Sequence, residues 1–323
     1  MTPDFRLIAN SQDVTATIRD RLISLRVTDE SGMTSDTITL SLDDRDHKYA
    51  WPEHGAQLEC FLGYQETSLM RVGTYVVDEL SHGGPPATLS IHGKAVDMRA
   101  EFKAHKTRSW DNVTVDTLVQ TIAAEHHLTP KVSIALASIL LLHIDQTDES
   151  DLHFLTRIAN DFDGVVKPVN GFLLFVNKGE SKSVSGQQIP PVTISTQDIL
   201  TYRMTHADRG KYASVRSFYQ NTDGAELVEI LVGEGKPTYT LRHPHASAEE
   251  AAQKGRAKLT ALQRGTATLS LSVIGNLDLR AEGRMKVSGI RQPVDGEWVM
   301  TRVEHSLSAS GLVTTVDAEI PKR

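Results

Sequence analysis

Histidine has the most potential for chemistry in this chain, because thirteen are present and imidazole binds metals and carries protons. Two pairs lie close together in the sequence. His126 and His127 are adjacent, so on a helix they point about 100° apart and cannot share a metal. His243 and His245 flank Pro244, but no cysteine or carboxylate stands nearby at zinc-ligand spacing. We therefore expect no metal site and no cofactor, and interpret His243 and His245 as solvated loop residues.

Acidic residues offer calcium-binding or catalytic groups at two places. Asp43–Asp46 begins like a calcium loop, but Lys48 and His54 stand where that loop needs glycine and glutamate. Ser247–Glu250 has the spacing of a capping box, in which serine and glutamate bind the first free amides of a helix. We interpret the first segment as a charged turn and the second as a helix start.

Nucleophiles and phosphate-binding motifs give no stronger signal. Cys60 is the one cysteine, which excludes an internal disulfide, and its apolar neighbours favour a small core residue. The chain has no Gly-x-Ser-x-Gly elbow and no phosphate loop. Gly233-Glu234-Gly235 lacks the third glycine of a dinucleotide motif, and Lys236-Pro237 follows it. The sequence predicts no catalytic residue, no cofactor-binding residue and no metal ligand.

Composition limits the class of protein. With 323 residues, of which 39% are hydrophobic and 23% charged, we expect two or three packed domains. No apolar run approaches the roughly 18 residues of a membrane span, and no secretory signal begins the chain. The net charge of −7 argues against a dedicated nucleic-acid binder, which normally carries a basic face.

Hydrophobic spacing divides the chain into three regions. A period of two predicts strands in residues 5–100, within Asp13–Ile18, Leu22–Val27, Thr37–Leu42 and Gln57–Gly63. Helical spacing follows Thr114 and Asp151, and Asn170-Gly171 between apolar runs predicts a hairpin. After a polar linker at Lys178–Pro191, strands return from Val192, interrupted by one helix between Ser247 and Gly265.

One stretch occurs twice. Val72–His82 and Asp295–His305 share Gly, Val and His at the same three places, and Tyr faces Trp. The structural repeat positions are Gly73, Tyr75, Val76 and His82 in the first copy, and Gly296, Trp298, Val299 and His305 in the second. Two similar β units would explain the match, and so would the general pattern of a strand after a glycine turn.

The order of segments resembles the phage late-control D proteins, which form the baseplate hub of contractile tails and are related to the hub part of type VI secretion spike proteins. Trp51–Gly55, Gly73–Glu79 and Leu89–Ala95 carry the resemblance early in the chain. Glu149–Ala159, followed by the Asn170-Gly171 hairpin, is the most specific piece. Gly296–His305 through Thr315 matches at the end.

The resemblance implies a mainly β fold with an α+β insertion: two related β-barrel tube domains separated by a small α+β domain. We expect a first tube domain at residues 1–98, a middle domain at 99–190 and a second tube domain with one inserted helix at 191–323. It also implies a homotrimer whose six barrels form a pseudo-six-fold ring, so that a six-fold tail tube fits a three-fold spike.

Further partners follow from the same resemblance. They are a separate trimeric tail spike protein, the tail tube protein and other baseplate proteins, in a virion tail baseplate made in the bacterial host cytoplasm. DNA would pass only through the lumen, without specific nucleic-acid binding. Two alternatives stay open: a β-rich carbohydrate-binding or adhesion protein of a tail or cell surface, and a cell-wall hydrolase. The first needs exposed aromatic residues, and the second needs a carboxylate pair in a cleft.

Overall fold

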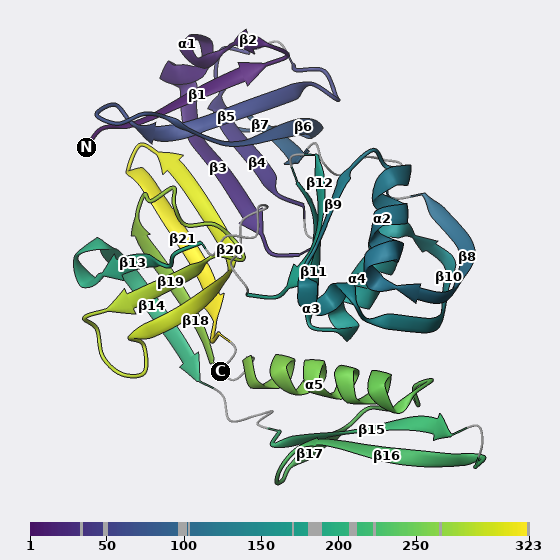
Figure 1. The fold of residues 1–323 in the computed structure, drawn as a ribbon. Helices are drawn as coiled ribbons and strands as arrows, with labels where there is room; N and C mark the ends of the chain where they lie inside the picture. Colours follow the sequence, from purple (N-terminus) through teal and green to yellow (C-terminus); the bar gives the residue numbers. More distant parts are fainter. Residues whose placement is uncertain are drawn as a thin grey trace. The chain divides into compact units, whose positions relative to one another are not determined.

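The computed structural model describes residues 1–32, 35–47, 51–95, 102, 104–169, 171–179, 189–206, 212–221, 224–264 and 267–321 (Figure 1). The chain divides into two compact units. The first comprises Met1–Met98, Pro190–Arg203 and Leu269–Ala318, and the second comprises Arg99–Ile189, Met204–Thr268 and Glu319–Arg323. Strands dominate, so the predicted mainly β fold with an α+β insertion is confirmed. Within the described ranges, no helix is long and apolar enough to cross a membrane.

The N-terminal part of the first unit contains six main strands and a short β2 at its edge. They pair in the order β3-β4-β7-β6-β5-β1, with β2 beyond β1. Their bounds are β1 (Pro3–Ala9), β2 (Gln12–Asp13), β3 (Leu22–Glu30), β4 (Thr37–Asp43), β5 (Gln57–Tyr64), β6 (Met70–Gly83) and β7 (Thr88–Ala95).

The C-terminal part of the same unit contains six more strands, which pair in the order β14-β18-β21-β20-β19-β13. Numbered one to six along the chain, both sets have the order 2-3-6-5-4-1. They differ at one end, because β1 is antiparallel to β5 whereas β13 is parallel to β19. The bounds are β13 (Val192–Ser195), β14 (Ile199–His206), β18 (Ala267–Ile274), β19 (Arg284–Ser288), β20 (Gly296–Ser308) and β21 (Gly311–Glu319).

Closure of either set into a barrel remains a prediction. Between described residues, no strand pair joins β3 to β1 or β14 to β13. Instead, β20 pairs with β3, so that the two sets form one continuous sheet of thirteen strands.

An insertion separates β14 from β18, at the place where a short connection links β3 to β4. It contains β15 (Ser214–Asn221), β16 (Glu226–Gly233), β17 (Thr238–Thr240) and α5 (Ala248–Arg264). The predicted capping interaction begins α5, since Ser247 Oγ accepts a hydrogen bond from the Glu250 amide at 3.2 Å. The helix packs on β15 and β16, and Arg264 at its end pairs with Asp163 and Glu319 within the second unit.

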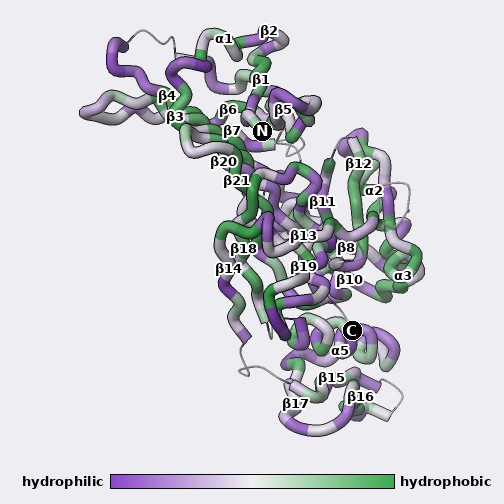
Figure 2. Tube along the Cα trace, turned by 90° about the vertical axis from the view of Figure 1, so that its left-hand side faces the viewer, coloured by the Kyte–Doolittle hydropathy of each residue, from purple (hydrophilic) through white to green (hydrophobic). Residues whose placement is uncertain are grey.

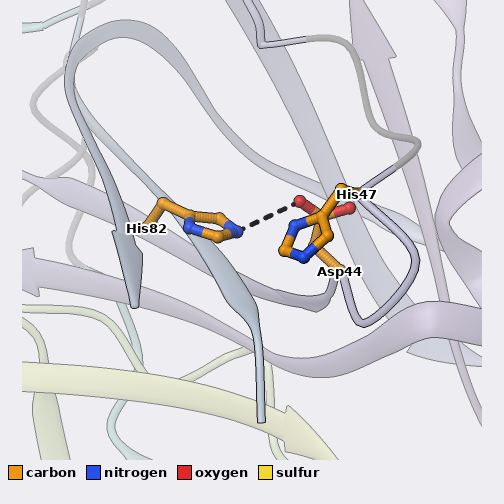
Figure 3. Close-up of side chains that lie close together, drawn as sticks. All are labelled: Asp44, His47 and His82. Carbon is orange, nitrogen blue, oxygen red and sulfur yellow. Dashed lines mark ion pairs between the residues drawn. The ribbon is translucent and has the colours of Figure 1, made fainter. Parts of the chain in front are cut away.

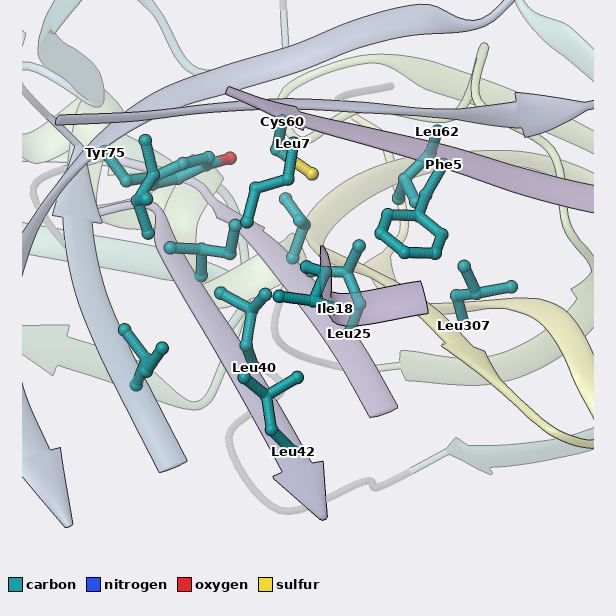
Figure 4. Packing of buried hydrophobic residues seen from close by; sticks show 14 of the residues in the cluster. Phe5, Leu7, Ile18, Leu25, Leu40, Leu42, Cys60, Leu62, Tyr75 and Leu307 are labelled. Atoms are coloured by element: carbon teal, nitrogen blue, oxygen red, sulfur yellow. The ribbon is translucent and has the colours of Figure 1, made fainter. Parts of the chain in front are cut away.

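Alternating residues build the core of the N-terminal set, as the period of two predicts (Figure 4). Leu40 and Leu42 of β4 and Leu58, Cys60 and Leu62 of β5 are all buried. The prediction of a small core residue at Cys60 is therefore confirmed. Figure 2 shows that β20 and β21 of the C-terminal set also contain hydrophobic stretches.

The predicted strand at Asp13–Ile18 is wrong beyond its first residue. Thr15–Ile18 forms a single helical turn, α1, followed by a 3₁₀ turn at Arg19–Arg21. The Thr15 side chain explains this, because its hydroxyl accepts a hydrogen bond from the Leu7 amide at 2.9 Å and so ties the turn to β1. Ile18 still reaches the core, but from a helix.

The middle region forms the predicted helices and hairpin. α2 (Val115–Glu125) begins where Thr114 accepts the Thr117 amide, and α4 (Asp151–Asp161) begins where Ser150 accepts the His153 amide. The hairpin consists of β11 (Gly164–Val169) and β12 (Phe172–Asn177). Gly171 has φ +80°, as a tight turn requires, while Asn170 lies outside the described residues. The region is completed by β8 (His105–Thr114), β9 (Thr129–Val132), α3 (Ile134–Ala137) and β10 (Leu140–Ser150).

Asp151, the first residue of α4, is the most enclosed carboxylate of this region, with no exposed side-chain surface. Lys106 Nζ lies 2.6 Å from it and Arg108 Nη2 lies 2.8 Å from it. His126 and Gln146 also bind it, at 2.7 and 2.9 Å. Burial alone would raise the pKa of Asp151, but these hydrogen bonds and the Arg108 charge lower it overall.

We expect Asp151→Asn to destabilise the chain by about 2–3 kcal/mol, because it leaves two partly buried cations short of one partner. The loss stays in that range because Lys106 and Arg108 both retain Glu125. Urea unfolding of the full chain measures it. The control is Asp148→Asn, since the Asp148 side chain is 85% exposed and asparagine tolerates its positive φ. Equal midpoints for both variants would show that the Asp151 cluster adds nothing to stability.

Candidate functional site

The two copies of the repeated stretch lie in β6 and β20, and each pairs with the preceding strand in the same register. Glycine opposes an apolar residue, and the aromatic residue two positions later opposes another. The pairs are Gly73 with Cys60 and Tyr75 with Leu58 on β5, and Gly296 with Val287 and Trp298 with Met285 on β19.

The aromatic residues fill the interior at these positions. Tyr75 and Trp298 are each 2% exposed. Burial raises the pKa of the Tyr75 hydroxyl, and Trp298 Nε1 donates a hydrogen bond to the Val294 carbonyl at 2.9 Å. Both side chains therefore act as large core residues.

Glycine is required in both copies, for different reasons. A Cβ on Gly73 would lie 2.6 Å from Cζ of Tyr75 and closer still to its hydroxyl, because the ring covers this glycine. Gly296 has open space around it, but its φ of +146° is rarely adopted by other residues.

In both strands, the alternation of inward-facing and outward-facing residues shifts by one residue at the same place. In β6, Tyr75 and Val77 face inward and are followed by Leu80 rather than a residue at 79. In β20, the shift comes after Met300, and Val303 is the next inward residue. A bulge between Val77 and Glu79 explains the shift in β6.

The remaining repeat positions differ in burial. Val76 opposes Gln57 and is half-buried, whereas Val299 opposes Arg284 and is buried. His82 is exposed, whereas His305 is only 5% exposed and lies 2.9 Å from the Thr314 hydroxyl through Nδ1. Burial lowers the pKa of His305 to about 4.

β20 joins the two strand sets. Its first part, Gly296–Val299, pairs with β19, and its second part, Arg302–Ser308, pairs with β3. Ion pairs lie across the second part: Arg302 Nε is 2.9 Å from Glu30, and Arg26 Nε is 3.1 Å from Glu304. Leu307 packs into the core of the N-terminal set (Figure 4).

A polar cluster lies at the far end of β6 (Figure 3). Asp44, His47 and His82 place ligand atoms within 4.8 Å of one another, and Asp44 is buried. Two imidazoles and a carboxylate form a set that binds zinc or iron in other proteins. Here the 3.3 Å contact of His82 Nε2 with Asp44 accounts for the arrangement as an ordinary strand-end interaction. The absence of a metal stays a prediction.

The neighbouring acidic residues form the charged turn that we predicted. Arg45 pairs with Asp43, and Arg21 Nη2 lies 2.7 Å from Asp46. Because arginines already bind these two carboxylates, the segment is not arranged as a calcium loop.

The two histidine pairs have separate environments. His126 is buried against Asp151 at the end of α2, and His127 follows it with φ +55°. His243 is exposed, as predicted for a loop residue. The same prediction for His245 is wrong, because its backbone binds β15 and burial lowers its pKa.

Sequence reasoning missed two groups of charged residues that join parts of the fold. The ion pairs between β20 and β3 join positions about 270 residues apart, and no local spacing signals such a contact. The Asp151 cluster had a partial signal in the sequence, because Asp151 follows the Ser150 cap in the first turn of a helix, where a carboxylate is favoured. The burial of Asp151 and Ser150 became visible only in the structure.

We expect His305 to make stability fall with decreasing pH. Its pKa is depressed in the folded chain, so below about pH 6.5 the unfolded chain binds a proton that the folded chain excludes. Stability is therefore lost between about pH 6.5 and 4, with a loss of about 2 kcal/mol between pH 7 and 5. Urea midpoints at the two pH values measure it.

His305→Gln should remove that part of the pH dependence. The matched control is His82→Gln at the exposed counterpart, which should retain the wild-type dependence. The expectation fails if both variants lose stability equally between pH 7 and 5.

Solved structures of low identity share the fold. The 43 kDa tail protein of prophage MuSo2 from Shewanella oneidensis has a TM-score of 0.74 at 13% identity, covering 98% of both chains. A component of the type VI secretion system of E. coli has a TM-score of 0.60 at 13% identity, covering 94% of this chain and 74% of the other.

Sequence relatives show the family. The chain is 32% identical to the probable baseplate hub protein of Escherichia phage 186 and 31% identical to that of Escherichia phage P2. Each match covers 99% of this chain, and 93% or 94% of the relative. The phage tail baseplate hub (GPD) family model matches residues 76–311. The chain therefore belongs to the phage tail baseplate hub family, whose place is the virion tail baseplate.

Proposed function

We propose that three copies of this chain form a closed ring that presents six similar β units to the tail tube and three-fold symmetry to the spike. Each copy would contribute one unit from residues 1–98 and one from residues 191–323, with residues 99–190 as a separate middle domain.

The repeated strand order carries this proposal. Both sets pair as 2-3-6-5-4-1, and both fifth strands carry the glycine, the aromatic residue and the inward shift at equivalent positions. A chain with two similar units makes a pseudo-six-fold ring when three copies close, whereas three copies of a chain with one unit do not. The proposal thereby explains why one chain holds the same arrangement twice.

The proposed role is structural and requires no reaction. The polar clusters are engaged in ion pairs: Asp151 with Lys106 and Arg108, and Asp43 with Arg45. The proposed partners are a trimeric tail spike protein, the tail tube protein and other baseplate proteins. Electrostatics favours free passage of DNA through the lumen, because a chain with net charge −7 offers phosphate little attraction.

Light scattering of the purified chain should give a mass about three times 35.5 kDa at high protein concentration. The physical reason is that ring closure satisfies the exposed strand edges of all three copies at once. Averaged electron-microscopy images of the same sample should show a ring with a central hole.

Dilution provides the control, since a specific trimer dissociates over a defined concentration range whereas an aggregate grows without limit. A particle that stays monomeric at high concentration, both alone and with its spike protein, would contradict the proposal. So would a ring of two or four copies.

A further inference from the structure

The pairing of β20 with β3, which joins the two strand sets within one chain, is a model for a second pairing between chains. One edge of β20 is occupied along its length by two strands in succession: β19 at Gly296–Val299 and β3 at Arg302–Ser308. The other edge carries β21. β3 is therefore the outer strand of the N-terminal set, sealed by a strand of the C-terminal set.

β6 is the counterpart of β20, but half of the equivalent edge has no strand beside it. β5 pairs with Met70–Val76, and the Val77 amide donates to the Ala56 carbonyl. From Asp78 to Gly83, no strand of the described chain pairs with this edge. Burial agrees, since His305 and Leu307 in β20 are buried while Ser81, His82 and Gly83 in β6 are exposed.

β14 is the counterpart of β3. Each strand begins directly after a 3₁₀ turn, at Arg19–Arg21 for β3 and at Thr196–Asp198 for β14. β3 lies between β4 and β20, whereas β14 ends the sheet, with only β18 beside it in the described chain. Two large apolar residues are left in water there: Leu200 is 53% exposed and Tyr202 is 47% exposed.

We propose that β14 of one copy pairs antiparallel with the Glu79–Gly83 edge of β6 in a second copy, as β3 pairs with β20 within the chain. This inference rests on the proposed trimer and identifies its contact. The two open edges are the counterparts of the two edges that are already joined, so a second copy of this chain is the partner that fits both.

The intrachain joint fixes the expected register. Arg26 opposes Ser306 and Thr28 opposes Glu304 across β3 and β20. Aligning β14 with β3 at their 3₁₀ turns, and β6 with β20 at Gly73 and Gly296, places Arg203 opposite Gly83 and Thr205 opposite Ser81. A slip of one residue would turn every side chain of one strand to the other face.

The two open edges differ from the intrachain joint in their charges. Within the chain, Arg26 of β3 pairs with Glu304 of β20. Arg203 occupies the position of Arg26 on β14, but Ser81 stands at the counterpart of Glu304, and Glu79 lies four residues along β6 from Gly83, which opposes Arg203. The proposed pairing therefore rests on the strand hydrogen bonds of an antiparallel ladder and not on an ion pair at this position.

A disulfide across the predicted register tests the pairing. Thr205→Cys with Ser81→Cys should give a covalent trimer on a denaturing gel without reductant, because opposed residues of antiparallel strands lie within disulfide distance. Both positions are exposed, so the substitutions should not disturb the core. The native Cys60 will not interfere, because it is fully buried and burial raises the pKa of its thiol.

Two matched variants complete the experiment. Thr205→Cys with His82→Cys is slipped by one residue and should crosslink at least about tenfold less, because its thiols face opposite sides. Arg26→Cys with Ser306→Cys spans the joint within one chain and should close without changing the oligomer. Circular dichroism before oxidation verifies that each variant is folded.

The outcomes separate this inference from the trimer itself. A trimer by light scattering with no crosslink at 205 and 81, while the intrachain control closes, would overturn the pairing and leave the proposed function standing. A monomer without crosslinks would overturn both. Equal crosslinking of the correct and slipped pairs would indicate random collision and would also overturn the pairing.

Discussion

The continuity of the sheet in the first unit depends on how the two edges of one strand, β20, are shared among its neighbours. β20 gives one edge to β21 and divides the other between β19 and β3. This division joins the two strand sets into one sheet of thirteen strands and places Leu307 in the core of the N-terminal set. Because backbone hydrogen bonds and buried apolar surface both cross the joint, we expect the two sets to lose their structure together.

Local chemistry made much of the fold predictable. Thr114 and Ser150 begin helices by binding free amides, and Leu40 and Leu42 mark a strand through their period of two. The same period misled at Thr15–Ile18, because the alternation is equally compatible with a tethered helical turn. The repeat was visible in its residue types, but the joint between β20 and β3 was not, since it depends on contacts about 270 residues apart.

The two copies show how a shared backbone tolerates different side chains. Tyr75 and Trp298 fill the same position, although a ring crowds Gly73 and a backbone angle restricts Gly296. His82 and His305 share a position but differ in exposure, which sequence cannot reveal because it depends on what covers the strand. In β20 that cover includes the neighbouring set, and burial lowers the pKa of His305 to about 4.

The insertion between β14 and β18 affects how a ring of such units could be recognised. Its counterpart between β3 and β4 is a short connection, so the two halves of the chain are alike in their sheets and unlike in this one loop. In a ring of six, every second unit would carry β15, β16, β17 and α5, and its neighbours would not. Three of the six units would then carry the insertion. A partner that binds on that side could contact these insertions and so distinguish two orientations that the sheets alone make equivalent.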